Sequence, residues 1–290
     1  MESCYKMYGR FIDFFINNRQ MLDALVFDID GTLSCGGKSI PEAVNLISFL
    51  RQEKMPFFLL TNDANTSHTD KAQIVASSGI PVKPEEIISA GDALAQYIID
   101  HGLAGHKFYQ CGEMGNPGYA EQAGAVIVRD WREAGDCEGL IIGEGVYDWR
   151  KEVTGAFNLL MKNPLLPVLV GNPDSFWPFR HGLGIGAGAM ARFLGTLIKE
   201  SGYDLNIIYT GKPYAPVYEL VKQRLCDLLP DTQHLDMSRV AMIGDSLASD
   251  ITGGNRAGML TCLVLTGITT LEQAEAASGE RKPDKIFASL

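Results

Sequence analysis

Residues 24–32 read ALVFDIDGT, an apolar run that ends in two aspartates and a glycine. A short unbroken apolar run is typical of a buried parallel strand, whose last residues emerge into a crevice at the carboxyl edge of the sheet. Open α/β sheets bind their ligands at that edge. The stretch therefore predicts that Asp28 and Asp30 lie where such a fold carries its chemistry.

Three interpretations of this pair of aspartates are open. Asp-Gly after a strand often forms only a turn. A calcium loop that began at Asp28 would need a third oxygen ligand at its fifth position and a glutamate at its twelfth, where Thr32 and Ser39 stand, and this argues against calcium. The third interpretation is a nucleophilic carboxylate, Asp28, beside a proton-exchanging carboxylate, Asp30. It requires further acids, a cation and a metal from elsewhere in the chain.

The composition limits the class of partner. The chain has 290 residues, a formal net charge of −10 and 46% hydrophobic residues, which supply the core of one large domain or two ordinary ones. The acidic balance and the lack of a basic run argue against nucleic acid and anionic membranes as partners. An anionic substrate would need a locally positive site built from a metal ion, a lysine and backbone amides.

The cysteines and histidines indicate no further site. The six cysteines form no regular framework, so we interpret them as free thiols in a reducing cytoplasm. Cys35, close behind Asp28, is interpreted as a bystander thiol rather than a reactive one. The histidines form no His-x-x-x-His pair, which leaves a zinc site without support. No stretch resembles a signal peptide or a membrane span.

Residues 1–21 are interpreted as an N-terminal extension. Apolar side chains recur there at helical spacing, which predicts an amphipathic helix docked on the body of the protein or on a second subunit. A membrane anchor is the weaker interpretation because the stretch lacks a basic face.

Strand and helix patterns alternate along the rest of the chain. Strands are expected at residues 24–27, 56–60, 87–89, 108–110, 125–128, 139–142, 168–170, 206–209, 240–243, 261–265 and 286–287. Helices are expected at 41–53, 67–78, 92–101, 117–122, 151–162, 189–201 and 216–228. The short elements of residues 106–204 predict a small α/β domain inserted into a core of residues 22–105 and 205–290.

Four alternating glycines, Gly182 to Gly188, precede the last helix of the insertion. Their spacing differs from that of a dinucleotide-binding loop, and no apolar strand leads into them. We therefore predict a flexible loop that runs into a helix.

Four of the expected strands are followed by functional polar groups. These are Asp28 and Asp30, Thr61 and Asn62, Lys212, and finally Asp245 with Asp250. Any one group has an ordinary explanation as a turn or a solvated strand end. We expect all four strands to converge at one sheet edge, which is much harder to explain in that way.

Such a gathering of aspartates has a chemical consequence. The aspartates cannot all stay ionised without a cation, and carboxylates with a backbone carbonyl and waters form a hard oxygen site that Mg²⁺ prefers. The ion and Lys212 would neutralise a phosphoryl group, while Thr61 and Asn62 donate hydrogen bonds to its oxygens. Asp28 would attack phosphorus to give an aspartyl phosphate. Asp30 would protonate the leaving oxygen and later deprotonate the attacking water.

These motifs resemble those of a known family. Asp-x-Asp-Gly-Thr at 28–32, Thr-Asn at 61–62, Gly-Lys-Pro at 211–213 and Gly-Asp-x-x-x-x-Asp at 244–250 are similar to the four motifs of the haloacid dehalogenase superfamily of phosphatases. The large insertion between the second and third motifs resembles the NagD-like, 4-nitrophenylphosphatase subfamily, as do the stretches 80–92, 172–174 and 265–267.

The resemblance implies a fold and a set of roles. The fold would be α/β, a Rossmann-like doubly wound parallel sheet with an inserted smaller α/β cap that screens the site and chooses the substrate. Asp28 would be the nucleophile, Asp30 the acid/base and Lys212 the charge stabiliser, and Thr61 and Asn62 would bind phosphate. Mg²⁺ would be held by the Asp28 carboxylate, the Asp30 carbonyl and Asp245, with Asp250 nearby. The substrate would be a small phosphorylated metabolite, and two copies would pair as a homodimer through the cap.

Two positions depart from the subfamily pattern. Asp63 stands where Asn or Ser is usual, and Ser246 stands where Arg is usual. Neither change removes a catalytic group, but both bear on the choice of substrate.

Three functions compete. A magnesium-dependent phosphomonoesterase is the preferred one. A phosphotransferase or mutase is disfavoured because mutases of the superfamily usually carry a smaller cap, placed earlier in the chain. A non-catalytic regulatory protein that binds a phosphate ligand would have no chemical need for Asp30.

The loop that carries Asp174 and Trp177 is the candidate for substrate choice. Trp177 would stack on a ring or a sugar face, and Arg180 and His181 would meet a second anionic or polar group. Packing of Trp177 in the core of the cap is an equally open interpretation.

Overall fold

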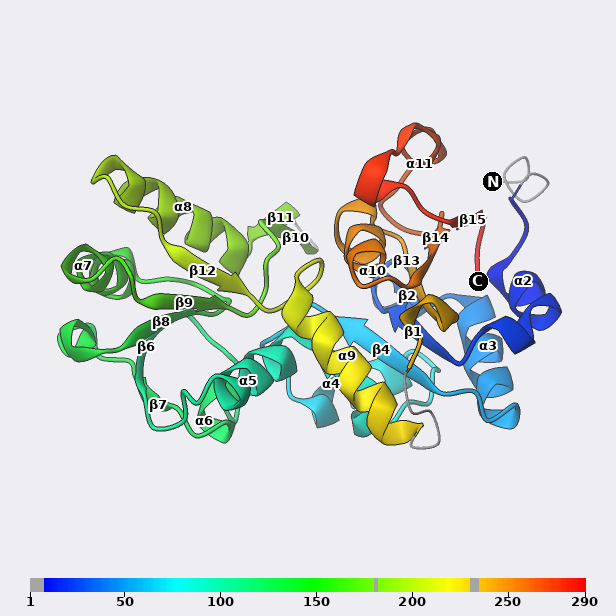
Figure 1. The fold of residues 1–290 in the computed structure, drawn as a ribbon, viewed down its shortest axis with the longest axis horizontal. Helices are drawn as coiled ribbons and strands as arrows, with labels where there is room; N and C mark the ends of the chain where they lie inside the picture. The colour runs from blue at the N-terminus through cyan, green and yellow to red at the C-terminus, as the bar shows by residue number, and fades with distance from the viewer. Residues whose placement is uncertain (1–7, 180–181, 230–234) are drawn as a thin grey trace. The chain divides into compact units, whose positions relative to one another are not determined.

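The computed structural model describes residues 8–179, 182–229 and 235–290, which divide into two compact units (Figure 1). Unit 1 comprises the described parts of Met1–Thr61, His68–Ile88 and Tyr218–Leu290. Unit 2 comprises those of Asn62–Ser67 and Ser89–Val217. The sequence-based division into a core and a cap follows other bounds, and which residues act as core and which as cap stays a prediction.

Unit 1 is built on a six-stranded sheet with the strand order β15-β14-β13-β1-β4-β5. Its strands are β1 (Ala24–Asp28), β4 (Phe57–Thr61), β5 (Ile87–Ser89), β13 (Val240–Gly244), β14 (Leu260–Val264) and β15 (Lys285–Phe287), and β2 (Ser34–Cys35) with β3 (Lys38–Ser39) forms a small hairpin. The accompanying α-helices are α2 (Phe11–Asn17), α3 (Pro41–Gln52), α4 (His68–Ser77), α10 (Thr252–Arg256), α11 (Leu271–Ala276) and, from Tyr218 onward, α9 (Ala215–Leu228).

The central strand β1 is buried on both faces of this sheet. Leu25 and Phe27 belong to the hydrophobic core that contains residues of α2, α3 and α4. Val26 points to the opposite face and is buried as well. The chain proceeds from β1 through β4 to β5 on one side and through β13 and β14 to β15 on the other, and the pairings of β1 with β4 and β13 are parallel. This confirms the doubly wound sheet, with its topological switch point at the end of β1.

The N-terminal helix α2 docks on unit 1. Phe11 and Phe15 are completely buried. The Phe11 ring meets that of Phe27 edge-on at 6.1 Å and that of Phe287 at 5.6 Å, and the Phe15 ring meets that of Phe49 at 6.3 Å. Of the two dockings that the sequence allowed, the described helix therefore shows the one on the body of the protein; residues 1–7 of the extension lie outside the described residues.

Unit 2 is built on a five-stranded sheet with the order β12-β9-β8-β6-β7, in which all the pairings are parallel. Its strands are β6 (Lys107–Cys111), β7 (Val126–Val128), β8 (Gly139–Ile142), β9 (Pro167–Val170) and β12 (Asn206–Tyr209). Its α-helices are α5 (Ala90–Asp100), α6 (Tyr119–Gln122), α7 (Thr154–Lys162) and α8 (Ala187–Glu200). Leu140 and Val168 lie in a core with α7 and α8, and their neighbours Ile141 and Leu169 lie in a second core with α5 and α6, so helices cover both faces.

The strand that precedes Lys212 corrects the sequence analysis. β12 pairs with β9, from Asn206 opposite Pro167 to Tyr209 opposite Val170, and is therefore an edge strand of unit 2. The expectation that four strands converge at one sheet edge is wrong, because only β1, β4 and β13 are neighbours in unit 1. A buried parallel strand is recognisable from its apolar run, but its sequence does not specify which sheet it joins.

The glycine-rich stretch is a hairpin rather than a flexible loop. β10 (Phe176–Phe179) pairs antiparallel with β11 (Gly182–Ile185), and α8 follows directly. A Cβ on Gly184 would meet the indole of Trp177, so the glycine leaves room for the ring of the opposite strand. The helix was expected, but the strand was hidden because glycine is a poor strand former.

Among the described residues, no helix combines the length and the apolar character that crossing a lipid bilayer requires.

Docking of α2 predicts a matched pair of stability effects. Phe15→Ala should lower the free energy of unfolding by about 3–5 kcal/mol, because it removes a fully buried ring. Its neighbour Ile16 is half exposed, so Ile16→Ala should change stability by only about 0.5 kcal/mol. Urea unfolding of both variants measures the difference. Equal effects would contradict the docking of this helix.

Candidate active site

Three strand ends of unit 1 bring polar groups to one edge of the sheet. β1 ends at Asp28, β4 at Thr61 and β13 at Gly244, immediately before Asp245. In the sheet β1 lies between the other two, with Asp28 opposite Leu60 of β4 and Phe27 opposite Ile243 of β13. The switch point thus places Asp28, Thr61 and Asp245 side by side.

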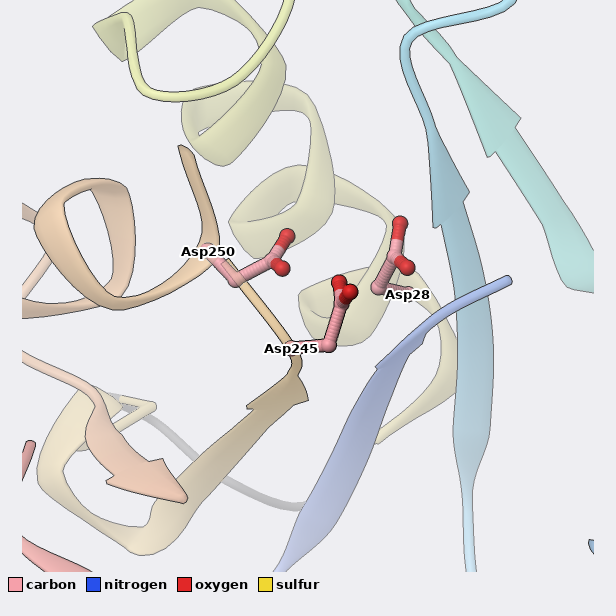
Figure 2. A group of neighbouring side chains, drawn as sticks. All are labelled: Asp28, Asp245 and Asp250. Carbon is pink, nitrogen blue, oxygen red and sulfur yellow. The ribbon is translucent and has the colours of Figure 1, made fainter. Parts of the chain in front are cut away.

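Asp28, Asp245 and Asp250 form a compact carboxylate cluster (Figure 2). One oxygen from each lies within 4.8 Å of the others. The three residues are only 8%, 4% and 0% exposed, so water screens their mutual repulsion poorly. Buried like charges at this spacing repel one another, and three carboxylate oxygens are ligands that a hard divalent cation accepts. The cluster is therefore a candidate cation site.

The loop after β14 holds Asp245 in place. The backbone N–H of Ile268 donates to Oδ2 of Asp245 at 2.7 Å, and the hydroxyl of Thr269 donates to its carbonyl. A Cβ on Gly267 or on Gly31 would collide with the Asp245 carboxylate. Both glycines are therefore required by close packing, and Gly31 also adopts a positive φ of 86°.

The same loop reaches the strand end that carries Asp28. The hydroxyl of Thr266 donates to the carbonyl of Gly31 at 2.6 Å. The sequence had singled out residues 265–267 only as a point of family resemblance. Their contacts give a physical reason: the segment fixes the backbone on both sides of the cluster.

Asp250 is held by the turn that it helps to form. It lies in a short π-helix, Leu247–Ile251, and its Oδ2 accepts the backbone N–H of Ser246 at 3.0 Å. Ser246, one of the two departures from the subfamily pattern, accepts the N–H of Ser249 through its hydroxyl and begins this turn. Its role here is local, because the side chain supports the segment that carries Asp250.

The second aspartate of the opening motif differs from the first. Asp30 is exposed, and its carboxylate accepts a hydrogen bond of 3.4 Å from the hydroxyl of Ser34. The backbone N–H of Gly31 donates to the carbonyl of Ser34 at 2.6 Å. Asp28 is buried and Asp30 is exposed, so the two carboxylates occupy different environments, and the roles predicted for them stay predictions.

Unit 2 holds a second set of predicted site residues. Lys212 is 3% exposed. The Asn62 amide grips the backbone of Lys212, since its Oδ1 accepts the Lys212 N–H at 2.7 Å and its Nδ2 donates to the Lys212 carbonyl at 3.2 Å. The same Nδ2 donates to Asp174 at 3.2 Å. Within unit 2 the structure therefore brings Asn62, Asp174 and Lys212 together.

Comparison with known proteins identifies the family. A family model of haloacid dehalogenase-like hydrolases matches residues 25–125, and a second model, described as HAD-hydrolase-like, matches residues 209–290. The chain belongs to the haloacid dehalogenase superfamily. Its curated relatives are acid sugar phosphatases and its structural neighbours include a p-nitrophenyl phosphatase, so the protein is a phosphatase of the haloacid dehalogenase type.

Three relatives illustrate the similarity. An acid sugar phosphatase of Staphylococcus haemolyticus (strain JCSC1435) is 28% identical over 91% of this chain and 92% of its own length. A p-nitrophenyl phosphatase from Archaeoglobus fulgidus is 27% identical, with a TM-score of 0.75, over 92% of this chain and 96% of its own. A glycerol phosphate phosphatase from Mycobacterium tuberculosis, solved in complex with magnesium, shares the fold at 24% identity, with a TM-score of 0.76, over 93% and 76% of the two chains.

Trp177, a predicted substrate-binding residue of this haloacid dehalogenase family member, lies on the β10–β11 hairpin. It is 46% exposed, with its ring over Gly184. Nearly half of its surface is therefore exposed, and its role in substrate binding stays a prediction. Arg180 and His181, named with it, lie outside the described residues.

Asp63, the other departure from the subfamily pattern, caps a turn. Its Oδ1 accepts the backbone N–H groups of Asn65 and Thr66 at 2.8 and 3.1 Å. The negative charge near the phosphate motif of this phosphatase thus has a structural use in shaping the 62–67 segment.

Sequence reasoning missed one residue, Glu144. Its carboxylate accepts a hydrogen bond of 2.8 Å from Nδ2 of Asn172. Burial raises the pKa of Glu144 above its ordinary value. A lone glutamate in a polar loop carries no motif, so only its contacts identify it.

The close packing around Asp245 predicts that a larger residue at Gly267 weakens metal binding. Gly267→Ala places a methyl group on the Asp245 carboxylate and should weaken apparent Mg²⁺ affinity by about 10-fold or more. The Mg²⁺ dependence of the melting temperature measures that affinity. Gly195→Ala is the control, since its Cβ would make only an ordinary 3.5 Å contact with Ile207. An unchanged Mg²⁺ response of Gly267→Ala would contradict the role assigned to the cluster.

Proposed function

We propose that this chain is a magnesium-dependent phosphomonoester hydrolase that acts on a small phosphorylated metabolite through an aspartyl-phosphate intermediate. The observation that carries the proposal is the buried cluster of three carboxylates at the switch point of the unit 1 sheet. A nucleophile and a cation site are the two parts that phosphoryl transfer needs at one place.

The residues present fit a magnesium ion. Asp28, Asp245 and Asp250 supply carboxylate oxygens close enough to share one ion, and they include no sulfur or imidazole ligand that would favour a softer metal. The Asp28 carboxylate, the Asp30 carbonyl and Asp245 would hold the ion, with Asp250 beside them. When bound, the ion would neutralise charge on the phosphoryl oxygens. The magnesium complex of the glycerol phosphate phosphatase supports this choice of metal.

The reaction is proposed in two displacements. In the first, an Asp28 oxygen forms a bond to phosphorus, the bond from phosphorus to the ester oxygen breaks, and the leaving oxygen takes a proton from Asp30. In the second, Asp30 accepts a proton from water, whose oxygen attacks phosphorus as the bond to Asp28 breaks. Inorganic phosphate leaves, and Asp28 and Asp30 return to their starting states.

Further groups are proposed to bind the phosphoryl group. Lys212 would offset its charge, and the Thr61 hydroxyl would donate a hydrogen bond to it. The side-chain amide of Asn62 already has partners in Asp174 and in the backbone of Lys212. Its help to the phosphate is therefore proposed to include the orientation of Lys212.

The names of the relatives support a small substrate. The acid sugar phosphatase and the p-nitrophenyl phosphatase are named for small phosphomonoesters, so sugar phosphates are the first class to test. The predicted cap, residues 106–204, would screen the phosphoenzyme from water and choose among such substrates.

We also infer a cytoplasmic location and a homodimer formed through the cap. Five cysteines of the described residues are free thiols, which supports a reducing compartment. On one face of the β10–β11 hairpin, Phe176, Leu183 and Ile185 are exposed apolar side chains, which supports an interface between two copies.

The nucleophile test decides the proposed function. The parent protein should release phosphate from a panel of phosphomonoesters with Mg²⁺, and EDTA should abolish this activity. Asp28→Ala should lower the rate by at least about 1,000-fold, because it removes the attacking atom. Asp100→Ala, at the exposed end of α5, is the control and should retain the parent rate. A folded parent protein that releases no phosphate with Mg²⁺ would favour the phosphotransferase or the regulatory alternative.

The ratio of kcat/KM between two substrate classes tests whether Trp177 contributes to substrate specificity. Trp177→Ala should change the ratio of kcat/KM between sugar phosphates and aryl phosphates by about 10-fold, because it removes a stacking surface but no reacting group. Trp149→Ala removes another exposed indole of unit 2 and should leave that ratio unchanged. A uniform loss on every substrate in Trp177→Ala would count against a specificity role.

A further inference from the structure

Glu144 joins two loops of unit 2 through one buried carboxylate. The residue follows β8, and Asn172 Nδ2 of the loop after β9 donates to its Oε1 at 2.8 Å. The backbone N–H of Ala64 donates to the same carboxylate. Ala64 is completely buried in the core shared with α5 and α6. The carboxylate thus ties the 62–67 segment to the 172–174 loop.

The backbone of Glu144 is fixed independently of its side chain. Its N–H donates to the carbonyl of Glu113 at 2.8 Å, and its carbonyl accepts the N–H of Glu113 at 2.7 Å. Replacement of the side chain therefore leaves these two bonds in place. The Glu113 side chain, in contrast, is exposed and accepts a long hydrogen bond of 3.5 Å from Asn65, which a glutamine amide oxygen can also accept, so Glu113→Gln is a matched control.

A continuous path of hydrogen bonds leads from Glu144 to Lys212. Asn172 is held by Glu144 and, through its Oδ1, accepts the backbone N–H of Asp174 at 2.9 Å. Asp174 accepts a hydrogen bond from Nδ2 of Asn62, which grips the backbone of Lys212 on both sides. A Cβ on Gly211 would collide with Oδ1 of Asn62 and with Pro173, so this turn is packed directly against both loops.

We propose that Glu144 is a positioning residue of the phosphatase, which sets the orientation of Lys212 through Asn172, Asp174 and Asn62. The inference rests on the proposed function, because it takes Lys212 as the group that offsets phosphoryl charge. Glu144 itself touches no reacting atom. A displacement of Lys212 by about 1 Å would lower the reaction rate by about 100-fold. Glu144 can therefore affect the rate without contacting the substrate.

The positioning depends on the ionised form of Glu144. A carboxylate accepts from both Ala64 and Asn172, whereas a protonated carboxyl or an amide offers one donor and one acceptor group. Burial raises the pKa of Glu144, hydrogen bonds from Asn172 and the Ala64 backbone lower it, and the charges of Asp63 and Asp174 raise it. The net shift is upward, so protonation begins at a higher pH than for an exposed glutamate.

Two further ionisable neighbours of Glu144 among the described residues are acidic groups. Glu113 pairs with Glu144 through the backbone, and Tyr147, whose pKa is raised by burial and by Glu144, donates its hydroxyl proton to the carbonyl of Gly143 at 2.6 Å. Below the pKa of Glu144 the parent protein should therefore behave like a variant that carries an amide at this position.

Kinetics across pH test this prediction. Glu144→Gln should lower kcat/KM by about 10- to 100-fold at pH 8, and the ratio of parent to variant should approach one as pH falls through the pKa of Glu144. Taking the ratio cancels the pH dependence of the chemical step itself, which both proteins share. Glu113→Gln should follow the parent at every pH. A ratio that stays at one from pH 5 to pH 8 would overturn the proposal.

A measurement that needs no activity separates this inference from the proposed function. Hydrogen exchange at pH 8 should become faster in Glu144→Gln at residues 62–66, at 172–175 and at the Lys212 N–H, and remain at the parent rate in Glu113→Gln. Unchanged exchange at Lys212 would overturn the positioning role. A parent protein without phosphatase activity but with this exchange pattern would overturn the proposed function and leave the positioning of Lys212 supported.

Discussion

Mutual repulsion among three buried carboxylates is the constraint on which unit 1 depends. Asp28 is far in the chain from the turn that carries Asp245 and Asp250, yet one oxygen of each lies within 4.8 Å of the others. The backbone accommodates them by coming unusually close, since Gly31, Gly244 and Gly267 stand where a Cβ would fall on a carboxylate. Backbone N–H groups from the loops after β13 and β14 donate to Asp250 and Asp245. The fold thus concentrates carboxylates at one place, where a bound cation would offset their charge.

Unit 2 solves a different problem, which is orientation. The side chains that link its loops are mostly neutral amides. An amide donates and accepts hydrogen bonds at the same time, so it can hold two loops in a fixed relative orientation. Asn62 holds the backbone of Lys212, and Asn172 holds that of Asp174. The carboxylate of Asp174 lies within the series, and the carboxylate of Glu144 anchors its other end.

Local sequence patterns predicted many of the strands, helices and candidate site residues. They did not predict which elements and side chains contact one another in the folded chain. The apolar run before Asp28 identified β1 and its chemistry because burial and carboxylates leave a readable pattern. The partner of β12 was misassigned, since an apolar strand fits either sheet equally well. The β10–β11 hairpin was missed because its glycines make room for Trp177, a cross-strand relation that no local pattern records. Glu144 gave no signal at all, because its importance lies in which two loops it joins.

The segment 62–67 limits how unit 2 can be exchanged between proteins during evolution. Both of its ends continue into unit 1, yet it belongs to unit 2, where Ala64 fills a core and Asn62 grips Lys212. Residues 89–217 alone would lack that piece, so the larger part of unit 2 is not a transplantable module. A lineage that exchanged this region for another would have to exchange six residues elsewhere in the gene as well. Residues 62–67 and 89–217 are therefore expected to change together during evolution, because each stretch depends on contacts with the other.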